Sequence, residues 1–434
     1  MAPTICGMLD VALLRNDPDG LAAAMERRGV AVDIPALIEI DADRRRQRAA
    51  AEELRAEQNR RGKDIAGLAG DEKQAAVAAM ADLAERYKAA LGEADALDMR
   101  FDADWVRLPN PAHDSVPVGA GEDDNVEVRK WGTIPDFDFE PLDHLAIGEA
   151  LGVIDTERAA KVSGSRFGYL KGQLVLLHFG LIQWALGKLV AEGFVPVLPP
   201  VLVRDAALYG TGFFPGAREQ VYAVGVSDER SDTIESDDLF LVGTAEVPLA
   251  GMHMDEILDV GDFPLRYAGY STCFRREAGT YGKDTRGLFR VHQFDKLEMF
   301  SFVAAEDSWE EHERLLAIEE SIVQGLGLPY RLVNVCTGDL GDSAAKKYDI
   351  EAWFPGQGGY REITSCSNTT DFQARRLRIR YRVDKGTEVA HTLNGTAVAG
   401  RALIALLENN QQGDGTVVVP EVLRPFVGLD ALTP

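Results

Sequence analysis

The sequence predicts an α+β protein in which an N-terminal antiparallel helical hairpin precedes a largely antiparallel sheet flanked by helices. Two observations lead to this prediction. The first part of the chain holds two long helical patterns joined by a Gly-containing turn, and the later part holds many short strand-like runs with few crossover helices. With 434 residues, the chain is long enough for roughly two or three domains and a large core.

Composition restricts the class of protein. Hydrophobic residues make up 46% and charged residues 27%, which is typical of a globular chain and not of a disordered or collagen-like one. The 70 acidic residues outnumber the 46 basic ones and give a net charge of −24. Such a field repels phosphate, so any contact with nucleic acid requires local basic patches.

The cysteines and the N-terminus indicate a cellular compartment. The four cysteines, at positions 6, 273, 336 and 366, lie far apart, which disfavours a disulfide framework and a structural zinc site. No signal peptide is visible, and the most apolar run, 174–186, is interrupted by polar residues and too short for a bilayer. We therefore expect a cytoplasmic protein without a membrane segment.

The predicted helical hairpin covers about residues 33–107. Asp33 can cap a first helix that ends near Lys63, a turn follows at 67–70, and a second helix continues to Trp105. Apolar residues repeat on two heptad positions of the second helix and predict a packed seam. The first position holds Val77, Ala84, Leu91 and Trp105, and the second holds Met80, Tyr87, Ala94 and Phe101.

The first helix of this hairpin carries a local excess of positive charge. Eight basic residues and three acidic ones lie between positions 44 and 63, the reverse of the balance in the whole chain. A solvated face with i,i+4 ion pairs is the usual explanation for such a helix. A thin arm buries little core, so binding of a polyanion is the competing explanation. The candidate residues are Arg44, Arg45, Arg48, Arg55, Arg60, Arg61 and Lys63.

Beyond the hairpin the patterns become mixed. The Pro-, Gly- and Asp-rich stretch 112–143 is predicted to be a linker, and the acidic stretch 228–238 a surface loop. An amphipathic helix is predicted over 174–192 and leads into the apolar, Pro-rich run 194–200. Short strand-like runs recur at 221–224, 239–242, 288–291, 297–302 and 332–335.

Four arginines near the C-terminus form a period-two pattern. Arg376, Arg378, Arg380 and Arg382 alternate with apolar residues, so a strand through them would place all four on one face. A solvated sheet edge and a contact surface for an RNA acceptor stem explain this pattern equally well.

The densest cluster of reactive residue types lies between Phe274 and Glu298, in a strand, Gly-rich loop, strand pattern. Guanidinium groups match phosphate oxygens in a bidentate manner, and the Phe294 ring offers a flat surface for a base. A surface hairpin with paired charges is the alternative. The basic members are Arg275, Arg276, Lys283, Arg286, Arg290 and Lys296.

This cluster, FRREAGTYGKDTRGLFRVHQFDKLEMF, resembles motif 2 of class II aminoacyl-tRNA synthetases in the form found in seryl-tRNA synthetases. The resemblance extends over nearly the whole chain. The triplet 244–246 is similar to the serine-binding motif of that family, and CTGDLGDSAAKKYDIEAW and REITSCSNTTDFQARR are similar to its active-site strands. LNGTAVAGRALIALLENNQ resembles motif 3, and the helical hairpin resembles the tRNA-binding coiled coil of the family.

The resemblance implies an organisation and an activity. An N-terminal tRNA-binding domain would span 1–112, and a class II catalytic domain 113–434. Motif 1, the dimer-forming element, would lie at about 172–200, motif 2 at about 271–300 and motif 3 at about 393–411. The implied protein is a homodimer that activates L-serine with ATP and Mg²⁺ and transfers it to the terminal ribose of serine tRNA. Selenocysteine tRNA is a further candidate substrate.

Roles for single residues also come from the resemblance. Arg275 is implied to neutralise the α-phosphate, Glu277 to contact ATP and Arg401 to hold the γ-phosphate, which makes them the expected catalytic residues. A pocket that hydrogen-bonds the serine hydroxyl can reject alanine. The implied serine-binding residues are Thr244, Ala245, Glu246, Arg275, Glu298 and Thr396.

The remaining implied residues hold ATP, its metal and tRNA. Glu362 and Ser365 are the implied protein ligands of Mg²⁺, which prefers oxygen. Lys283 and Arg286 extend the candidate tRNA surface. The implied ATP-binding residues are Arg275, Arg276, Glu277, Arg290, Val291, Phe294, Glu362, Ile363, Thr364, Ser365 and Arg401.

Two alternatives remain open at the level of sequence. A paralogue that activates serine for another acceptor or a specialised pathway would share these motifs, although carrier-protein ligases resembling this core lack the basic arm. A non-catalytic regulatory binder would share the fold alone. The intact Arg275, Glu277, Glu362 and Arg401 argue against that second alternative.

Overall fold

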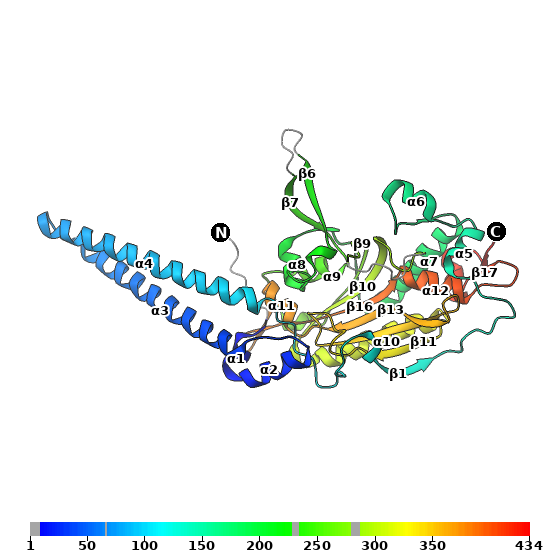
Figure 1. Ribbon diagram of the computed structural model, residues 1–434, viewed down its shortest axis with the longest axis horizontal. Helices are drawn as coiled ribbons and strands as arrows, with labels where there is room; N and C mark the ends of the chain where they lie inside the picture. Colours follow the sequence, from blue (N-terminus) through cyan, green and yellow to red (C-terminus); the bar gives the residue numbers. More distant parts are fainter. Residues whose placement is uncertain (1–8, 66, 228–233, 279–286) are drawn as a thin grey trace. The chain divides into compact units, whose positions relative to one another are not determined.

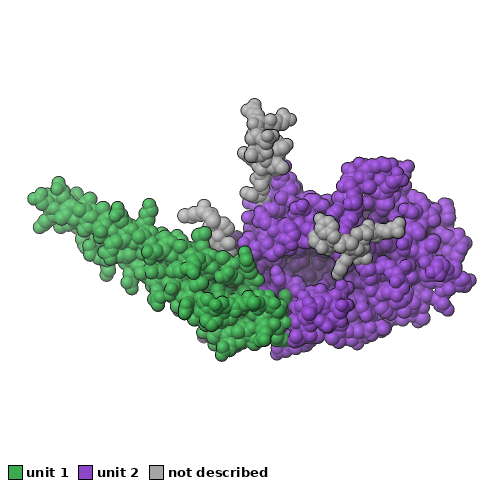
Figure 2. Space-filling view, viewed as in Figure 1, with its two compact units in different colours: residues 1–108 green, residues 109–434 purple. Residues whose placement is uncertain are grey.

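The computed structural model describes residues 9–65, 67–227, 234–278 and 287–434. The chain forms two compact units, Met1–Leu108 and Pro109–Pro434 (Figures 1 and 2). We call them unit 1 and unit 2 and describe each by itself.

The described part of unit 1 consists of helices. Two short helices, α1 Val11–Asn16 and α2 Pro18–Arg27, precede the long helices α3 Ile34–Ile65 and α4 Gly70–Trp105. Figure 1 shows α3 and α4 side by side as a hairpin. Asp33 accepts a hydrogen bond from the backbone N–H of Ala36 at 3.0 Å and thereby caps α3. The predicted antiparallel helical arm is confirmed.

The apolar seam of the arm differs in part from its prediction. Phe101 and Trp105 are buried, and their rings stack at 5.3 Å. The Trp105 indole Nε1–H donates to the Leu9 carbonyl at 3.2 Å. Val77, a predicted seam residue, is 53% exposed, whereas Leu83, outside the predicted pattern, is 2% exposed. Two helices alone cover a narrow stripe of each other, so a heptad pattern near the tip does not ensure burial.

Asp41 is a buried charge at the base of the arm. Its carboxylate is 2% exposed and lies 2.8 Å from Arg15, 2.7 Å from Arg44 and 3.1 Å from Arg45. Burial would raise the pKa of Asp41, but hydrogen bonds from Arg15 and Arg44 lower it to about 2. One carboxylate therefore links α1 to α3.

We expect Asp41→Asn to lower the free energy of unfolding of unit 1 by about 2 kcal/mol, because it removes the partner of a partly buried Arg44. The folded-state pKa lies below the unfolded value of about 3.9, so this stabilisation is present above about pH 4 and is lost as the pH falls toward 2. Urea unfolding followed by circular dichroism at pH 7 and pH 3 measures both effects. The control is Asp43→Asn, whose exposed carboxylate pairs with Arg46; equal losses in the two variants would contradict the importance of burial.

Unit 2 is built on an eight-stranded sheet with the order β1-β11-β12-β13-β16-β10-β9-β4. Neighbouring strands are antiparallel, except for β4 and β9 at one edge. This confirms the largely antiparallel sheet. Its strands are β1 Val126–Trp131, β4 Val195–Val197, β9 Leu265–Phe274, β10 Gln293–Val303, β11 Tyr330–Asn334, β12 Lys346–Phe354, β13 Gly359–Asn368 and β16 His391–Ala399.

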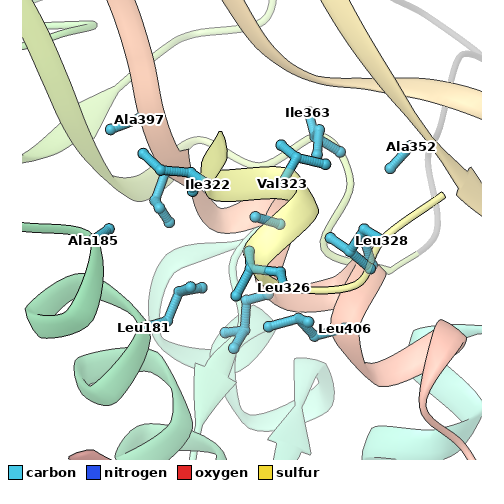
Figure 3. Packing of buried hydrophobic residues seen from close by; sticks show 14 of the residues in the cluster. Leu181, Ala185, Ile322, Val323, Leu326, Leu328, Ala352, Ile363, Ala397 and Leu406 are labelled. Carbon is cyan, nitrogen blue, oxygen red and sulfur yellow. The ribbon is translucent and has the colours of Figure 1, made fainter. Parts of the chain in front are cut away.

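Three helices pack against one face of this sheet and form the main core with it. They are α7 Gln173–Ala191, α10 Ser308–Gly325 and α12 Gly400–Asn409. Figure 3 shows Leu181 of α7, Ile322 of α10 and Leu406 of α12 in one cluster with Ile363 and Ala397 of the strands. Because side chains alternate along a strand, Lys296 and Glu298 of β10, on either side of the core residue Leu297, face away from these helices.

Smaller elements surround the sheet. The helices are α5 His144–Ala150, α6 Thr156–Ser163, α8 Asp205–Thr211, α9 Glu246–Gly251, α11 Phe372–Leu377 and α13 Arg424–Val427. The strands are β2 Ile154–Asp155, β3 Tyr169–Leu170, β5 Leu202–Arg204, β6 Tyr222–Ser227, β7 Ile234–Leu241, β8 Ile257–Leu258, β14 Arg380–Val383, β15 Gly386–Val389, β17 Val417–Val418 and β18 Ala431–Leu432.

Helix α7 matches the amphipathic helix predicted over 174–192. Among the described helices it is the one whose length and composition would also suit a membrane span. Its residues Leu174, Leu177 and Leu181 are nevertheless buried in the core of unit 2. Core helices pass the same test of length and composition, so the helix is explained by its packing.

Several local predictions are wrong. The stretch 112–143, predicted to be a linker, contains β1, which pairs with β11 at the sheet edge. The run 288–291 forms turns and bends in place of a strand. The other four predicted strand-like runs correspond to β6, β7, β10 and β11. The predicted loop 228–238 includes the start of β7 at Ile234, and 228–233 lie outside the described residues.

The four alternating arginines do not share a strand. Arg376 lies on α11, and Arg378 has a left-handed backbone with φ of 56° after that helix ends. Only Arg380 and Arg382 belong to β14, where both are exposed. The apolar residues between the four arginines belong partly to the end of a helix and partly to the start of a strand. Alternation in the sequence does not reveal this change from helical to strand period.

Candidate active site

The strand face opposite the main core carries a cavity of about 440 Å³. It gathers residues that are spread over more than half of unit 2 in sequence. Fourteen of the predicted serine- and ATP-binding residues line it: Thr244, Glu246, Arg275, Glu277, Arg290, Val291, Phe294, Glu298, Glu362, Ile363, Thr364, Ser365, Thr396 and Arg401.

Two β-bulges explain how the strands present some of these side chains. Residues three apart on a regular strand face opposite sides, yet Glu362 and Ser365 of β13 both line the cavity. The pairing of β13 with β12 shifts by one residue, which leaves Ile363 without a partner. A second bulge, in β16 opposite β10, brings Thr396 and Ala399 to the cavity in the same way.

Glu246, the first residue of α9, supplies one buried carboxylate. Its Oε1 accepts hydrogen bonds from Gln373 Nε2 at 2.7 Å and from Asn394 Nδ2 at 3.1 Å. Its backbone N–H donates to the Thr244 hydroxyl at 3.2 Å. Burial and the negative charge of Glu298 raise the pKa of Glu246 to about 7. The two carboxylates therefore lie close enough to repel each other.

Glu298 of β10 supplies the second buried carboxylate. Its Oε2 lies 2.6 Å from Lys296 Nζ and accepts the Thr396 hydroxyl at 3.3 Å. Lys296 is itself 7% exposed. Glu246 and Glu298 therefore present two carboxyl groups to one part of the cavity, where their oxygens can accept hydrogen bonds from a cation such as an ammonium group.

Two cavity arginines are each held by one acid. Arg401 Nη1 lies 2.8 Å from Glu362 Oε2, and Arg290 Nη1 lies 2.7 Å from Glu277 Oε2. Burial would raise the pKa of Glu362, but Arg401 and the nearby Lys347 lower it to about 2. A guanidinium group has five donors, so each arginine retains N–H groups for phosphate oxygens.

Arg275 follows the end of β9 and is fixed from two sides. Its guanidinium carbon lies 5.2 Å from the centroid of the Phe294 ring. Its carbonyl oxygen lies 2.9 Å from His292 Nδ1, and its backbone N–H donates to the His292 carbonyl at 3.0 Å. His292 therefore positions the backbone of Arg275, and it is absent from the residues that line the cavity.

Two predicted site residues do not line this cavity. Ala245 is fully buried in a separate apolar cluster, although both of its neighbours in sequence reach the cavity. The Arg276 side chain is exposed, and its backbone N–H donates to the Gln220 carbonyl at 2.9 Å. Lys283 and Arg286 lie outside the described residues.

Five contributors to the site were not among the predicted serine- and ATP-binding residues, although Lys296 belongs to the reactive cluster between Phe274 and Glu298. Lys296 and Asn394 precede Glu298 and Thr396 by two positions, so period two along β10 and β16 is a signal that could have found them. Phe289 lines the cavity, and the guanidinium carbons of Arg361 and Arg401 lie 4.1 and 4.6 Å from its ring centroid. Lys347 and Gln373, the remaining two, lie within the two stretches that resemble active-site strands, but nothing in those stretches singled them out.

The basic residues predicted to bind a polyanion fall into two groups on the arm. Near its base Arg44 and Arg45 pair with Asp41, and Arg48 pairs with Asp95 at 3.0 Å and with Asp98. These pairs link parts of unit 1 to each other. Farther along α3, Arg61 pairs with Glu57. Three exposed residues of α3 form no ion pair within the described chain: Arg55, Arg60 and Lys63.

Family models match both units. Residues 8–112 match the seryl-tRNA synthetase N-terminal domain, and residues 229–410 match the tRNA synthetase class II core domain (G, H, P, S and T). The chain is 50% identical over 429 residues to the serine–tRNA ligase of Nocardia farcinica, covering 98% of this chain and 100% of that protein. It is 51% identical over 426 residues to the serine–tRNA ligase of Streptomyces coelicolor, covering 97% of this chain and 98% of that protein.

Solved structures show the same similarity. The seryl-tRNA synthetase of Pyrococcus horikoshii complexed with ATP has a TM-score of 0.87 and 42% identity, and the match covers 98% of this chain and 99% of that one. The cytoplasmic serine–tRNA ligase of Naegleria fowleri in complex with AMP has a TM-score of 0.84 and 33% identity, with 98% of both chains covered. These similarities extend over the arm and the sheet alike, and the chain therefore belongs to the seryl-tRNA synthetase family of class II aminoacyl-tRNA synthetases.

Proposed function

We propose that this chain is a serine–tRNA ligase that makes seryl-adenylate from L-serine and ATP and then transfers serine to the 3′-terminal ribose of serine tRNA. One observation carries this proposal: a single cavity holds two buried carboxylates suited to an ammonium group and three arginines suited to phosphates. Similarity to serine–tRNA ligases over the whole length supports it further. The presence of the arm favours tRNA over a carrier protein as the acceptor.

In the first step the serine carboxylate attacks the α-phosphorus of ATP. A P–O bond forms to serine, the bond to the bridging oxygen of the β-phosphate breaks, and pyrophosphate leaves. Glu246 and Glu298 hold the serine ammonium, and Thr396 is close enough to Glu298 to bind the serine hydroxyl beside it. Arg275 neutralises the α-phosphate, while Arg290 and Arg401 hold the rest of the phosphate chain. The serine carboxylate is already ionised, so this step needs no general base.

Mg²⁺ fits beside Arg401. Glu362 and Ser365 offer hard oxygen donors on the same side of β13 because of the bulge between them. Mg²⁺ in nucleotide sites is commonly held by one or two protein oxygens together with phosphate oxygens. When bound, the ion neutralises charge on the phosphates.

Exchange of labelled pyrophosphate into ATP tests the first step. Exchange is expected with serine and not with alanine, because the buried partners of the hydroxyl are left unpaired by alanine. Charging of serine tRNA tests the second step. Failure to exchange with any amino acid would exclude the proposal, and exchange without charging would favour a different acceptor.

The distal arm is the proposed contact with tRNA. Replacing Arg55, Arg60 and Lys63 together by alanine should weaken tRNA binding and reduce its salt slope by roughly one for each lost phosphate contact. Serine-dependent exchange should stay unchanged, because the arm takes no part in adenylation.

Arg45→Ala provides a matched control for this triple variant. Its guanidinium group already pairs with Asp41, so we expect a smaller change in the salt slope. Filter binding of serine tRNA at several salt concentrations measures both variants. An unchanged affinity and slope in the triple variant would contradict the proposed contact.

We also infer that two chains associate through the region that resembles motif 1, and that the protein is cytoplasmic. Leu176 and Phe179 of α7 are 50% and 56% exposed, and Leu198 after β4 is 82% exposed. Neighbouring exposed apolar side chains are typical of an association surface. The described cysteines are free and buried, as in proteins of a reducing compartment.

A further inference from the structure

A chain of four polar side chains ends on the carboxylate of Glu246. The hydroxyl oxygens of Thr369 and Thr392 lie 2.6 Å apart, Thr392 Oγ1–H donates to Gln373 Oε1 at 3.0 Å, and Gln373 Nε2–H donates to Glu246 Oε1 at 2.7 Å. Thr369, Thr392 and Gln373 are fully buried. Thr369 directly follows β13, Thr392 lies on β16 and Gln373 on α11, so three separate parts of the fold meet at this chain. Thr369 and Thr392 do not line the cavity.

The acceptors around the Gln373 amide determine the direction of the hydrogen bonds in this chain. The Thr369 hydroxyl lies 2.7 Å from the Thr392 carbonyl and 2.6 Å from Thr392 Oγ1, so its single proton has an acceptor in either oxygen and the Thr392 proton remains available for Gln373 Oε1. The Gln373 amide then turns its two N–H groups toward Glu246 Oε1 and toward the Thr211 carbonyl, which lies 3.4 Å away. A reversed amide would place its oxygen against a carboxylate and a carbonyl with no proton between them, which is costly in a buried site.

We propose that Thr392, acting through Gln373, is a positioning residue for serine: its hydroxyl sets the orientation of the Gln373 amide, which in turn holds the Glu246 carboxylate toward the substrate ammonium. This inference rests on the proposed role of Glu246 in binding serine. Both amide donors, from Gln373 and Asn394, use Oε1 of Glu246. Oε2 accepts no hydrogen bond from the described residues and is left for the ammonium.

The charge of Glu246 is sensitive to this arrangement. Burial and Glu298 raise its pKa to about 7, while Lys296, the Gln373 hydrogen bond and Arg275 act in the opposite direction. Asn394 and Thr244, which also form hydrogen bonds with Glu246, carry no charge. Loss of the Gln373 donor should therefore shift Glu246 toward its neutral form near pH 7, and a neutral carboxyl binds an ammonium group poorly.

Thr392→Val and Thr392→Ser form the decisive pair of variants. Valine keeps the shape of threonine and removes the hydroxyl, whereas serine keeps the hydroxyl and removes a methyl group. In pyrophosphate exchange by the full-length protein, Thr392→Val should raise the KM for serine about tenfold, the value of one buried hydrogen bond. The KM for ATP should not change, and Thr392→Ser should restore serine binding.

The pH profile gives a second readout that a purely structural role would not move. With the parent protein, kcat/KM for serine should rise with pH as Glu246 ionises. In Thr392→Val the midpoint should move to higher pH, because the carboxylate has lost a hydrogen-bond donor. Equal effects of valine and serine at position 392, or a KM for ATP that rises as much as the KM for serine, would overturn the inference.

Two further variants keep the test decisive. Gln373→Met removes the donor at the other end of the chain, and it serves as the test variant if Thr392→Val does not fold. An unchanged KM for serine in either variant, once folded, also overturns the inference. Glu246→Gln tests the proposed function on which the inference rests. If Glu246→Gln leaves serine binding intact, the assignment of Glu246 is wrong. If Glu246→Gln weakens serine binding and Thr392→Val does not, only the positioning role of Thr392 fails.

Discussion

Replacing Arg275 by alanine should lower the rate of serine-dependent pyrophosphate exchange by about a thousandfold or more, the effect of losing a donor aimed at developing charge. Arg275 lines the cavity, and its guanidinium group lies against Phe294. Its backbone is held by two hydrogen bonds to His292, so its position is set before substrate binds. The loss should appear in kcat more than in the KM for serine, because the interaction strengthens as the phosphorus is attacked.

Arg276→Ala is the matched comparison. The two arginines are adjacent in sequence and both were expected at the ATP site, but the Arg276 side chain is exposed and does not line the cavity. A much smaller loss is therefore expected for Arg276→Ala. Similar losses in the two variants would show that the local geometry changes when substrate binds. Unchanged exchange in Arg275→Ala would refute its assigned role.

Replacing Glu298 by glutamine should raise the KM for serine by about a hundredfold or more and also destabilise unit 2. The substitution leaves Lys296, which is 7% exposed, without its charged partner at 2.6 Å. Removing one partner of a buried ion pair costs about 3–5 kcal/mol, because the other charge remains in a poorly solvated place. Serine binding suffers as well, because one of the two carboxylates that face its ammonium is neutralised.

A double-mutant cycle separates these two effects. Lys296→Met combined with Glu298→Gln removes both charges and should recover much of the stability lost in Glu298→Gln. It should not recover serine binding, because the carboxylate is still missing. Thermal unfolding and exchange kinetics measure the two quantities independently. Recovery of the KM for serine in the double variant would contradict a direct role of Glu298 in binding the ammonium group.

The helical arm shows how far a repeating pattern predicts structure. The cap at Asp33 depends on a residue three positions away, and the heptad positions of Phe101 and Trp105 follow a repeat within one helix; the structure contains the cap and buries both rings as expected. Burial of Val77 depended on a covering neighbour that two helices do not provide, so the pattern alone was misleading there. The pairing of Arg48 with Asp95 and Asp98, residues about fifty positions away, also required the fold.

In the cavity, too, the sequence predicted the residue types but not their arrangement. Short motifs were enough to propose most of its lining residues, because the chemistry of binding two anions and an ammonium group requires particular residue types. Their arrangement depends on non-local contacts. Glu362 and Ser365 reach the same cavity only because the pairing with β12 shifts by one residue. The partnership of Gln373 with Glu246 joins helices that are 127 residues apart in sequence, and no local pattern encodes it.

By itself, the sequence determined what depends on periodicity and residue type: the helical arm, the antiparallel character of the sheet and the chemistry of the cavity. The tertiary structure decided which charges pair, which side of a strand each residue faces after a bulge, and which uncharged side chains support the carboxylates. The physical reason is the distance along the sequence over which each kind of interaction acts. Helix caps, heptads and alternation act over a few residues, whereas burial, ion pairing and hydrogen-bond direction depend on groups that only the folded chain brings within about 3 Å of each other.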